Sequence, residues 1–264
     1  MTALPLAFTA LAALGAAFAV LYAVARRIDN YGIVDIAWSY AFGLLAVFYA
    51  LLGPGWPVRR AWIATLAVIW SVRLGTHLGI RVIGHHPVED GRYRQLRRDW
   101  AANIAPRMFW FFQLQAASVV LLGCAFLLPC LNSATRLHPL EIAGTLLWLA
   151  AISGEALADA QLAAFKRNAA AGGRVCDTGL WRYSRHPNYF FEWLVWVAYF
   201  VCSLASPCGW IAIVGPVSIL YLLLRVTGIP MTEEQSLRSR GDAYRRYQRA
   251  TSAFVPWFPR KPSP

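Results

Sequence analysis

Apolar stretches as long as a bilayer is thick recur along the whole chain, and they constrain its fold more than any other feature. The hydrocarbon core of a bilayer is roughly 30 Å thick, and a helix of about 20 residues crosses it. A helix also satisfies its own backbone hydrogen bonds there. The sequence therefore predicts an all-α, polytopic membrane bundle of about seven helices, with spans at residues 4–25, 33–52, 61–80, 108–128, 140–158, 189–204 and 210–224.

The composition agrees with a single integral membrane domain. Hydrophobic residues make up 58% of the chain and charged residues only 14%, whereas soluble domains carry about 25% charged residues. We expect one membrane domain over residues 1–264, ending in a cytoplasmic amphipathic segment, residues 231–264. That segment has helical spacing to about Arg240, a Gly-Asp interruption and then a further turn. Pro207 and Gly209 leave open whether the last two spans are two helices or one hairpin.

The distribution of basic residues predicts the orientation, because cytoplasmic loops are enriched in Lys and Arg. The connections after the first, third and fifth spans, together with the C-terminal segment and Arg225 at the end of the seventh span, hold 21 of the 25 basic residues. The N-terminus should therefore lie outside and the C-terminus in the cytoplasm. No basic residue precedes the first span, and Arg26 and Arg27 follow it. This is the reverse of a cleavable signal peptide, so we expect the span to be retained.

The net charge of +12 does not indicate nucleic-acid binding, because the arginines are divided among loops that alternate with membrane spans. Positive charge beside a membrane attracts anionic lipid headgroups, and membrane lipids are the expected partners. The five cysteines have neither CxxC spacing nor pairing with histidines at ligand intervals. We expect no metal site.

Ionisable residues inside spans are costly and usually face a bundle interior or a wet cavity. Four spans carry such residues at helical intervals, which places them in stripes along one helix face. These stripes consist of Asp35 with Trp38 and Ser39, Arg73 with His77 and Arg81, Glu155 with Asp159 and Lys166, and Asn188 with Glu192.

Two interpretations of these stripes remain open. The residues could form pairs that only hold helices together, such as Asp35 with Arg73 or Glu155 with His77. Alternatively, the stripes line a common cavity on the arginine-rich, cytoplasmic side. A cavity with carboxylates inside and cations at its mouth suits a ligand with a polar head and a polyanionic tail.

The residues before the sixth span favour phosphate binding. Arg182 and Arg185 precede a predicted helix start, where exposed N–H groups favour anions. Lys166, Arg167 and Arg174 come before them, and the stretch "AAGGR" allows close backbone approach. The pattern matches neither the Walker nor the Rossmann motif, so no standard phosphate loop is implied.

Several segments together resemble a known enzyme family. They are "HPVEDGRYRQLRRDW", "ALADAQLAAFK", "TGLWRYSRHPNYFFE" and "GIPMTEEQSLRSRGDAYRRYQRATSAFVPWFP". The chain is similar over residues 26–260 to the bacterial branch of the steroid 5-alpha-reductase superfamily. The resemblance implies a bacterial inner-membrane enzyme, monomeric, that binds NADPH from the cytoplasm. Such enzymes reduce a carbon-carbon double bond conjugated to a carbonyl in a steroid or other lipid.

The same resemblance implies roles for particular residues. The positions matching the family's cofactor contacts are Arg81, Arg92, Tyr93, Asp159, Lys166, Tyr183, Arg185, His186, Asn188, Glu192, Arg225, Tyr244 and Tyr247. The family's proton-donating tyrosine falls at or beside Trp70, whose indole has no transferable proton. The candidate catalytic residues are therefore Asp35, the only acid in the second span, with Tyr40 and His77 as further possible donors.

Two other functions compete with the reductase. Membrane isoprenylcysteine and phospholipid methyltransferases also carry an "RHPNY"-like stretch followed by two glutamates, here Glu233 and Glu234, and they bind S-adenosylmethionine. Asp159, Lys166 and "VEDGRY" favour the reductase, because they add contacts that a dinucleotide diphosphate can use. A non-enzymatic lipid scaffold or transporter is the third hypothesis, although the chain has no inverted repeat.

Overall fold

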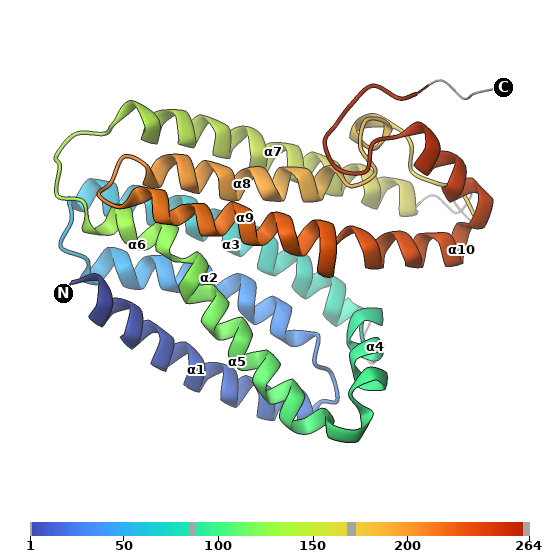
Figure 1. Ribbon diagram of the computed structural model, residues 1–264, viewed down its shortest axis with the longest axis horizontal. Coiled ribbons are helices and arrows are strands. Elements are labelled where there is room, and N and C mark those ends of the chain that lie inside the picture. Colours follow the sequence, from blue (N-terminus) through green and yellow to red (C-terminus); the bar gives the residue numbers. More distant parts are fainter. Residues whose placement is uncertain (1, 85–87, 168–172, 261–264) are drawn as a thin grey trace. The chain divides into compact units, whose positions relative to one another are not determined.

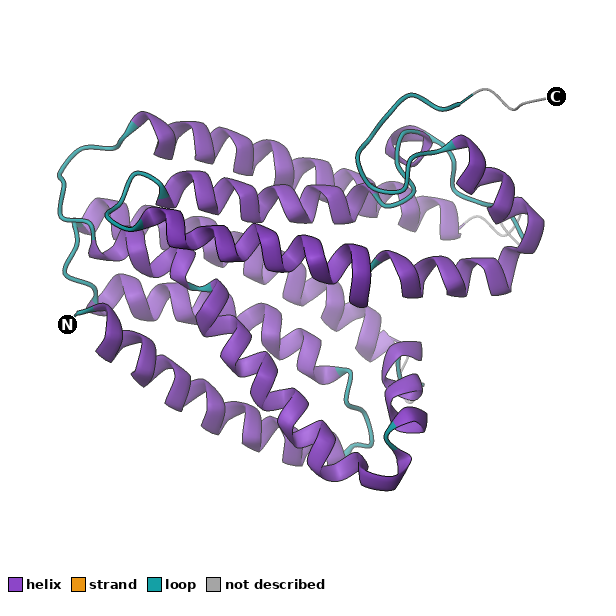
Figure 2. Cartoon of the chain, viewed as in Figure 1, coloured by secondary structure: helices purple, strands orange, loops and turns teal. Residues whose placement is uncertain are grey.

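The computed structural model describes residues 2–84, 88–167 and 173–260, and the elements found there are helices joined by turns and loops (Figure 2). By its internal contacts the chain divides into two compact units. The first unit comprises Met1–Pro139 and Ser203–Val214, and the second comprises Leu140–Cys202 and Gly215–Pro264.

The first unit is built on four long helical stretches (Figure 1). Its helices are α1 (Ala3–Arg27), α2 (Ile33–Leu52), α3 (Pro57–Gly84), α4 (Gly91–Asp99), α5 (Ile104–Leu122) and α6 (Cys124–Leu131), with 3-10 turns η1 (Ala101–Asn103) and η4 (Gly209–Ile213). Helix α2 packs along α3, and α5 lies against α1. Phe42 of α2 meets Trp70 and Phe126 edge-to-face, with ring centroids 5.5 and 6.3 Å apart, and forms the core between three helices.

Small residues let α2 and α3 approach closely. The backbone nitrogen of Gly43 donates to the Ser71 hydroxyl at 3.1 Å, and that hydroxyl donates to the Ser39 carbonyl at 2.7 Å. One turn along α3, a Cβ atom at Gly75 would lie 2.9 Å from the Tyr40 ring. Side-chain hydroxyls on backbone groups and glycines at crossings are the usual means of joining helices where lipid provides no hydrophobic drive.

A buried arginine in α3 holds the connection that follows α6. Arg59, in the first turn of α3, is 1% exposed. Its guanidinium donates to the Asn132 carbonyl at 3.1 Å, to the Arg136 carbonyl at 2.6 Å and to the Ala134 carbonyl. The connection after α6 is therefore held by charge-assisted hydrogen bonds to backbone oxygens.

The second unit is built of long helical stretches that lie side by side (Figure 1). Its elements are α7 (Pro139–Arg167), the 3-10 turn η3 (Gly179–Arg182), α8 (Pro187–Ser203), α9 (Val214–Tyr221), the π-helical turn η5 (Leu222–Val226) and α10 (Ile229–Ala250). Helices α7 and α8 approach closely where the ring of Phe191 lies over Gly154. The Trp148 indole also donates to the Tyr199 hydroxyl at 3.0 Å.

The C-terminal amphipathic helix α10 has the predicted interruption. Gly241, in its second half, has φ 49° and ψ −122°, which is not a helical conformation, and the helix bends there. Residues before Gly241 form one helical segment, and residues 242–250 form a second that carries Tyr244 and Tyr247. A positive φ of this kind favours glycine, so the sequence signal and the bend have the same cause.

In the described part of the chain, six helical stretches are long and apolar enough to cross a membrane, and the protein is an integral membrane protein. They are Ala3–Arg27, Ile33–Leu52, Pro57–Gly84, Ala101–Leu131, Pro139–Arg167 and the apolar part of Gly209–Ala250. The predicted span at 189–204 is helix α8, whose 17 residues reach about 25 Å. The count of seven spans therefore stays a prediction, as does the orientation.

The last two predicted spans are separate helices. Helix α8 ends at Ser203 and α9 begins at Val214. Between them Cys208 adopts a left-handed conformation, with φ 57° and ψ 18°, immediately before η4. Pro207 and Gly209, which the sequence singled out, lie on either side of Cys208 in this turn.

We predict that Gly144→Ala destabilises the second unit. A Cβ atom at Gly144 would clash with the Cys202 sulfur and lie 2.9 Å from the Ala198 carbonyl oxygen, so α7 and α8 must separate. Overpacking of this kind costs about 1–3 kcal/mol, which thermal unfolding in detergent would detect as a lower Tm. Gly79→Ala is the matched control. The nearest atom to its added Cβ is the Ile36 Cγ2 at 3.9 Å, so an equal loss of stability there would contradict the close-packing explanation.

Candidate functional site

Two clusters of polar residues, partly or fully buried, bring together six of the sixteen predicted site residues, and one cluster lies in each unit. The Asp35 cluster consists of Asp35, Arg92 and Tyr93 in the first unit. The Glu233 cluster consists of Arg185, His186, Glu233, Tyr244 and Gln248 in the second unit.

In the Asp35 cluster, one carboxylate accepts hydrogen bonds at both of its oxygens. Asp35 lies in the first turn of α2. The hydroxyl of Tyr93 donates to its Oδ1 at 2.7 Å, and the guanidinium of Arg92 donates to its Oδ2. The guanidinium also lies over the Tyr93 ring, 4.9 Å from the centroid. The structure thus joins a predicted catalytic residue to two predicted cofactor contacts.

Tyr93 is held as a protonated hydroxyl. Its side chain is fully buried. Burial and the negative charge of Asp35 raise the pKa of Tyr93 well above its usual value, although the charge of Arg92 lowers it. Because the hydroxyl keeps its proton and points at a carboxylate, it can act as a hydrogen-bond donor.

A second ion-pair network fixes α4, which carries Arg92 and Tyr93. Arg97 donates to Glu89 at 2.6 Å and pairs with Asp29 at 2.9 Å, and its guanidinium lies 4.5 Å from the Tyr31 ring centroid. Glu89 also accepts from the Tyr31 backbone nitrogen at 2.7 Å. The short α4 is therefore attached to the connection between α1 and α2. This network was not predicted from the sequence, although "VED" and the basic run after it contain its residues.

The other predicted residues of the first unit lie on α2 and α3. The Tyr40 hydroxyl is hydrogen-bonded to the Thr76 hydroxyl at 2.8 Å, and Arg81 pairs with Asp90 at 3.5 Å. Asp90 is the N-cap of α4 and accepts from the Arg92 backbone nitrogen at 2.9 Å. His77 has an exposed side chain on α3. Trp70 is fully buried in the aromatic core, which fits a packing role.

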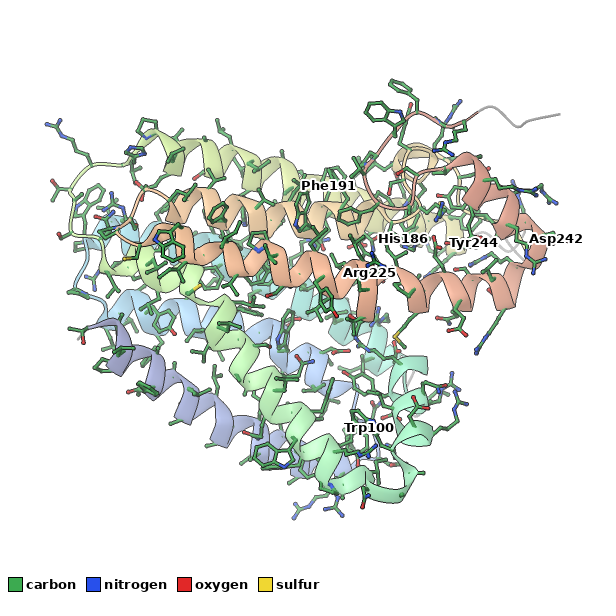
Figure 3. All side chains as sticks on the ribbon, viewed as in Figure 1. Trp100, His186, Phe191, Arg225, Asp242 and Tyr244 are labelled. Carbon is green, nitrogen blue, oxygen red and sulfur yellow. The ribbon has the colours of Figure 1, made fainter. Side chains whose placement is uncertain are left out.

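The Glu233 cluster joins the "RHPNY" stretch to the C-terminal helix. Arg185 donates from Nε to Glu233 at 2.6 Å and from a terminal nitrogen to the carbonyls of Gln248 and Thr251, at 2.9 and 2.6 Å. His186 Nε2 lies 3.3 Å from the same Glu233 oxygen, and Gln248 donates to the other oxygen at 2.9 Å. Figure 3 shows His186 and Tyr244 close together; Tyr244 donates to Glu233 at 3.5 Å.

These contacts shift the pKa values of the cluster. Burial alone would raise the pKa of Glu233, but hydrogen bonds from His186 and Arg185, the charge of Arg185 and a hydrogen bond from Gln248 lower it to about 2. Burial lowers the pKa of His186, although Glu233 opposes that shift. Burial and the charge of Glu233 raise the pKa of Tyr244 to about 12. Glu233 is thus charged and His186 neutral near neutral pH.

Arg185, which the sequence predicted to contact phosphate, is bonded to protein groups in the structure. Its Nε and one terminal nitrogen are bonded to protein groups, and these bonds fix the loop before α8. Glu233, to which the sequence assigned no role in the reductase, is the centre of the cluster. Its signal was the pair of glutamates two turns before the Gly241 interruption.

The remaining predicted residues of the second unit fall into two groups. Asn188 donates to Asp159 at 3.3 Å, so the predicted stripes on α7 and α8 do meet. Glu192 accepts from the Trp196 indole at 3.0 Å on its own helix. The others lie at or near helix ends. Lys166 on α7 and Arg225 in η5 are exposed. The Tyr183 ring meets the Phe258 ring edge-on, with centroids 6.1 Å apart, and the Tyr247 hydroxyl donates to the carbonyls of Trp181 and Ser184.

Among the described residues, no group of three or more His, Cys, Asp or Glu side chains is arranged to hold a metal ion. Parts of two predicted stretches, residues 85–87 in the "HHPVED" connection and residues 170–172 in "AAGGR", lie outside the described residues. The predicted common cavity would need residues of both units and stays a prediction.

The long apolar helices, with buried ion pairs where they meet their polar connections, define a polytopic membrane protein. The chain belongs to the family described as "Protein of unknown function (DUF1295)", whose model matches residues 21–251. No curated protein and no solved structure matches the chain.

We predict that Glu233→Gln destabilises the protein. The change leaves Arg185 without its anionic partner in a site where the arginine side chain is 10% exposed. Breaking a buried pair costs about 3–5 kcal/mol, and we expect about 3 kcal/mol because Glu233 is not fully buried. Thermal unfolding in detergent measures the loss.

The neighbouring Glu234→Gln is the matched control. Its ion pair with Arg238 is largely exposed, at 64% and 73% of the two side chains. Exposed pairs contribute about 0–1 kcal/mol, so the Tm should hardly change. Equal effects of the two substitutions would show that the Glu233 cluster has no special structural role.

The same cluster predicts how stability depends on pH. A carboxyl group with a lowered pKa stabilises the folded state fully above its unfolded pKa, here 4.5, and loses that contribution as the pH falls towards about 2. The lowered pKa of His186 adds a loss that begins below 6.5, because the unfolded chain takes up that proton first. The free energy of unfolding, measured between pH 7 and 3, should show both losses of stability. In Glu233→Gln the portion below 4.5 should be smaller, and an unchanged profile would contradict the assignment.

Proposed function

We propose that the protein is a membrane-embedded, NADPH-dependent reductase. Its substrate would be a steroid-like or other lipid molecule in which a carbon-carbon double bond is conjugated to a carbonyl. The reaction class is that of the oxidoreductases acting on CH–CH groups, similar to the 3-oxo-5-alpha-steroid 4-dehydrogenases. Sequence resemblance over residues 26–260 supports this function, and the family match covers nearly the same segment.

The observation that carries the proposal is the hydrogen bond from Tyr93 to Asp35, at 2.7 Å in a buried site. A conjugated carbonyl that accepts a hydride at its β-carbon develops negative charge on oxygen. A hydroxyl donor beside that oxygen stabilises the charge and supplies the proton that completes the reduction. NADPH supplies the hydride when it is bound.

Tyr93 is the proposed proton donor, and Asp35 is its partner. In the structure the single proton of the Tyr93 hydroxyl is donated to Asp35, so proton transfer requires this O–H to turn from the carboxylate to the substrate oxygen. Arg92 offsets the negative charge that Asp35 places beside the donor, since its guanidinium contacts both groups. A tyrosine from α4 thereby supplies the transferable proton that Trp70 lacks.

The second unit has the residue types that NADPH requires. Exposed basic side chains follow the end of α7 and continue into η3, namely Lys166, Arg167, Arg174 and Arg182. Guanidinium and ammonium groups suit the diphosphate and the 2′-phosphate. The Asp159 and Asn188 pair offers acceptors and donors for hydroxyl and amide groups. The ion pair of Arg185 with Glu233 holds the backbone between η3 and α8 in place.

A second candidate function is methyl transfer from S-adenosylmethionine to a lipid or prenylated substrate. The contact that favours it is the ion pair of Arg185 with Glu233, at 2.6 Å. This contact joins the "RHPNY" stretch to the pair of glutamates, the two features that the methyltransferases share. The Tyr93 and Asp35 pair has no evident use in methyl transfer, which is why we prefer reduction.

Ligand binding separates these functions. The protein purified in detergent should bind NADPH and give no detectable binding of S-adenosylmethionine when each is titrated by fluorescence or calorimetry. Binding of S-adenosylmethionine alone would reject the reductase and support the methyltransferase. Binding of neither would favour a lipid scaffold or transporter.

We predict that Tyr93→Phe abolishes most turnover without changing NADPH affinity. The substitution keeps the ring beside Arg92 and removes only the hydroxyl, whose proton transfer is worth about 10²–10⁴-fold in rate. NADPH-dependent reduction of lipid extracts, followed by mass spectrometry, measures the turnover.

Tyr22→Phe controls for the loss of a buried hydroxyl. Tyr22 donates to the Ala105 carbonyl at 2.7 Å, so its removal costs a comparable hydrogen bond away from the Asp35 cluster. Its turnover should stay within about twofold of the unsubstituted protein, since a net hydrogen bond is worth only about 1 kcal/mol of stability. Equal losses in both variants would count against Tyr93 as the proton donor.

A further inference from the structure

The last described residues, 251–260, form a loop with fixed backbone contacts, here called the C-terminal loop. Its Ser252 carbonyl accepts from the Arg185 nitrogen at 2.8 Å, and its Trp257 nitrogen donates to the Tyr183 carbonyl at 2.9 Å. The Arg260 nitrogen donates to the Ala250 carbonyl at 2.8 Å, which closes the loop onto the end of α10. The loop is therefore a preformed structure beside the start of α8.

The two sides of the C-terminal loop differ in burial. Phe254 is 8% exposed and packs on Phe190 and Trp193 of α8, with ring centroids 5.7 and 5.9 Å away. In contrast, Trp257 is 69% exposed and Phe258 76% exposed. Trp257 and Phe258 are large, exposed and carried by a fixed backbone. Such a pair indicates a surface that contacts an apolar environment outside the protein's own core.

The surroundings of these aromatic residues are positively charged. From residue 243 to the end of the sequence there is no Asp or Glu. Arg249 and Arg260 are both exposed, and the hydrogen bond between Arg260 and Ala250 brings their backbones together. Exposed aromatic residues next to cations are typical of segments that lie in the headgroup layer of an anionic membrane.

The position of the loop fits that layer. It is bonded to Tyr183, Ser184 and Arg185, two residues before Pro187 begins α8. Its inner residue Phe254 packs on Phe190 and Trp193, which lie in the first two turns of that apolar helix. Tryptophan and other aromatic side chains are enriched at this depth, where one part of the ring is in hydrocarbon and the other among headgroups.

We propose that the C-terminal loop is an interfacial anchor that binds anionic phospholipid headgroups of the protein's own bilayer. Trp257 and Phe258 insert at the level of the glycerol backbone, and Arg249 and Arg260 pair with lipid phosphates. The anchor holds the backbone of residues 183–185 against the membrane surface. It does not depend on the reductase hypothesis.

Hydroxyl-radical footprinting with mass spectrometry tests the anchor residue by residue. The full chain is placed in nanodiscs of phosphatidylcholine alone or of phosphatidylcholine mixed with phosphatidylglycerol. The oxidation rates of Trp257 and Phe258 should fall about threefold to tenfold in the anionic nanodiscs, and added salt should restore them. Trp210, 67% exposed in the turn η4, is the internal control whose rate should not depend on lipid charge.

Variants separate the charge from the aromatic contribution. Arg249→Gln/Arg260→Gln should remove the dependence on phosphatidylglycerol, while Arg238→Gln, an exposed arginine earlier in α10, should retain it. Equal oxidation of Trp257 in both kinds of nanodisc would overturn the proposal. Protection that follows protein concentration, with cross-linked dimers, would also overturn it and identify the surface as a contact between copies of the chain.

Discussion

Pairing between arginine and a buried carboxylate joins the polar connections of this protein to its membrane helices. In the first unit Arg92 binds Asp35 at the start of α2, and in the second unit Arg185 binds Glu233 at the start of α10. Charges at such positions are costly unless they are paired and fully hydrogen-bonded. Each pair is completed by a second donor, Tyr93 or Gln248, so each fixes a short polar segment relative to an apolar helix. The candidate chemistry depends on these fixed segments.

The apolar framework could be predicted from the sequence, because long hydrophobic stretches have one stable form in a bilayer. The structure extends several predicted spans: the stretch at 61–80 lies within Pro57–Gly84, and that at 140–158 within Pro139–Arg167. Helices continue past the hydrocarbon where polar residues keep the helical pattern, and hydropathy does not detect those ends. The interruption at Gly241 was predictable because glycine with a positive φ is a local signal.

The contacts within the candidate site were harder to predict from the sequence. The hydrogen bond between Asp35 and Tyr93 joins residues 58 positions apart, and nothing in the spacing of either segment selects one partner from the other arginines and tyrosines nearby. The sequence assigned Asp35 a catalytic role and Tyr93 a cofactor contact, whereas the structure joins their side chains by a hydrogen bond. The meeting of Asp159 with Asn188 was closer to prediction, because both lie on regular stripes of neighbouring helices.

The π-helical turn η5 has a consequence for how this chain can vary in length. A π turn holds one residue more than an α turn, and Leu222–Val226 lies between the apolar α9 and the polar α10, from which Thr227 and Gly228 separate it. One residue added to a regular α-helix would rotate everything after it by about 100°. A π turn takes up such a residue locally, so the helix faces before and after it keep their directions. The segment between Tyr221 and Glu233 is therefore a place where related chains can differ by one residue and still form the ion pair of Glu233 with Arg185.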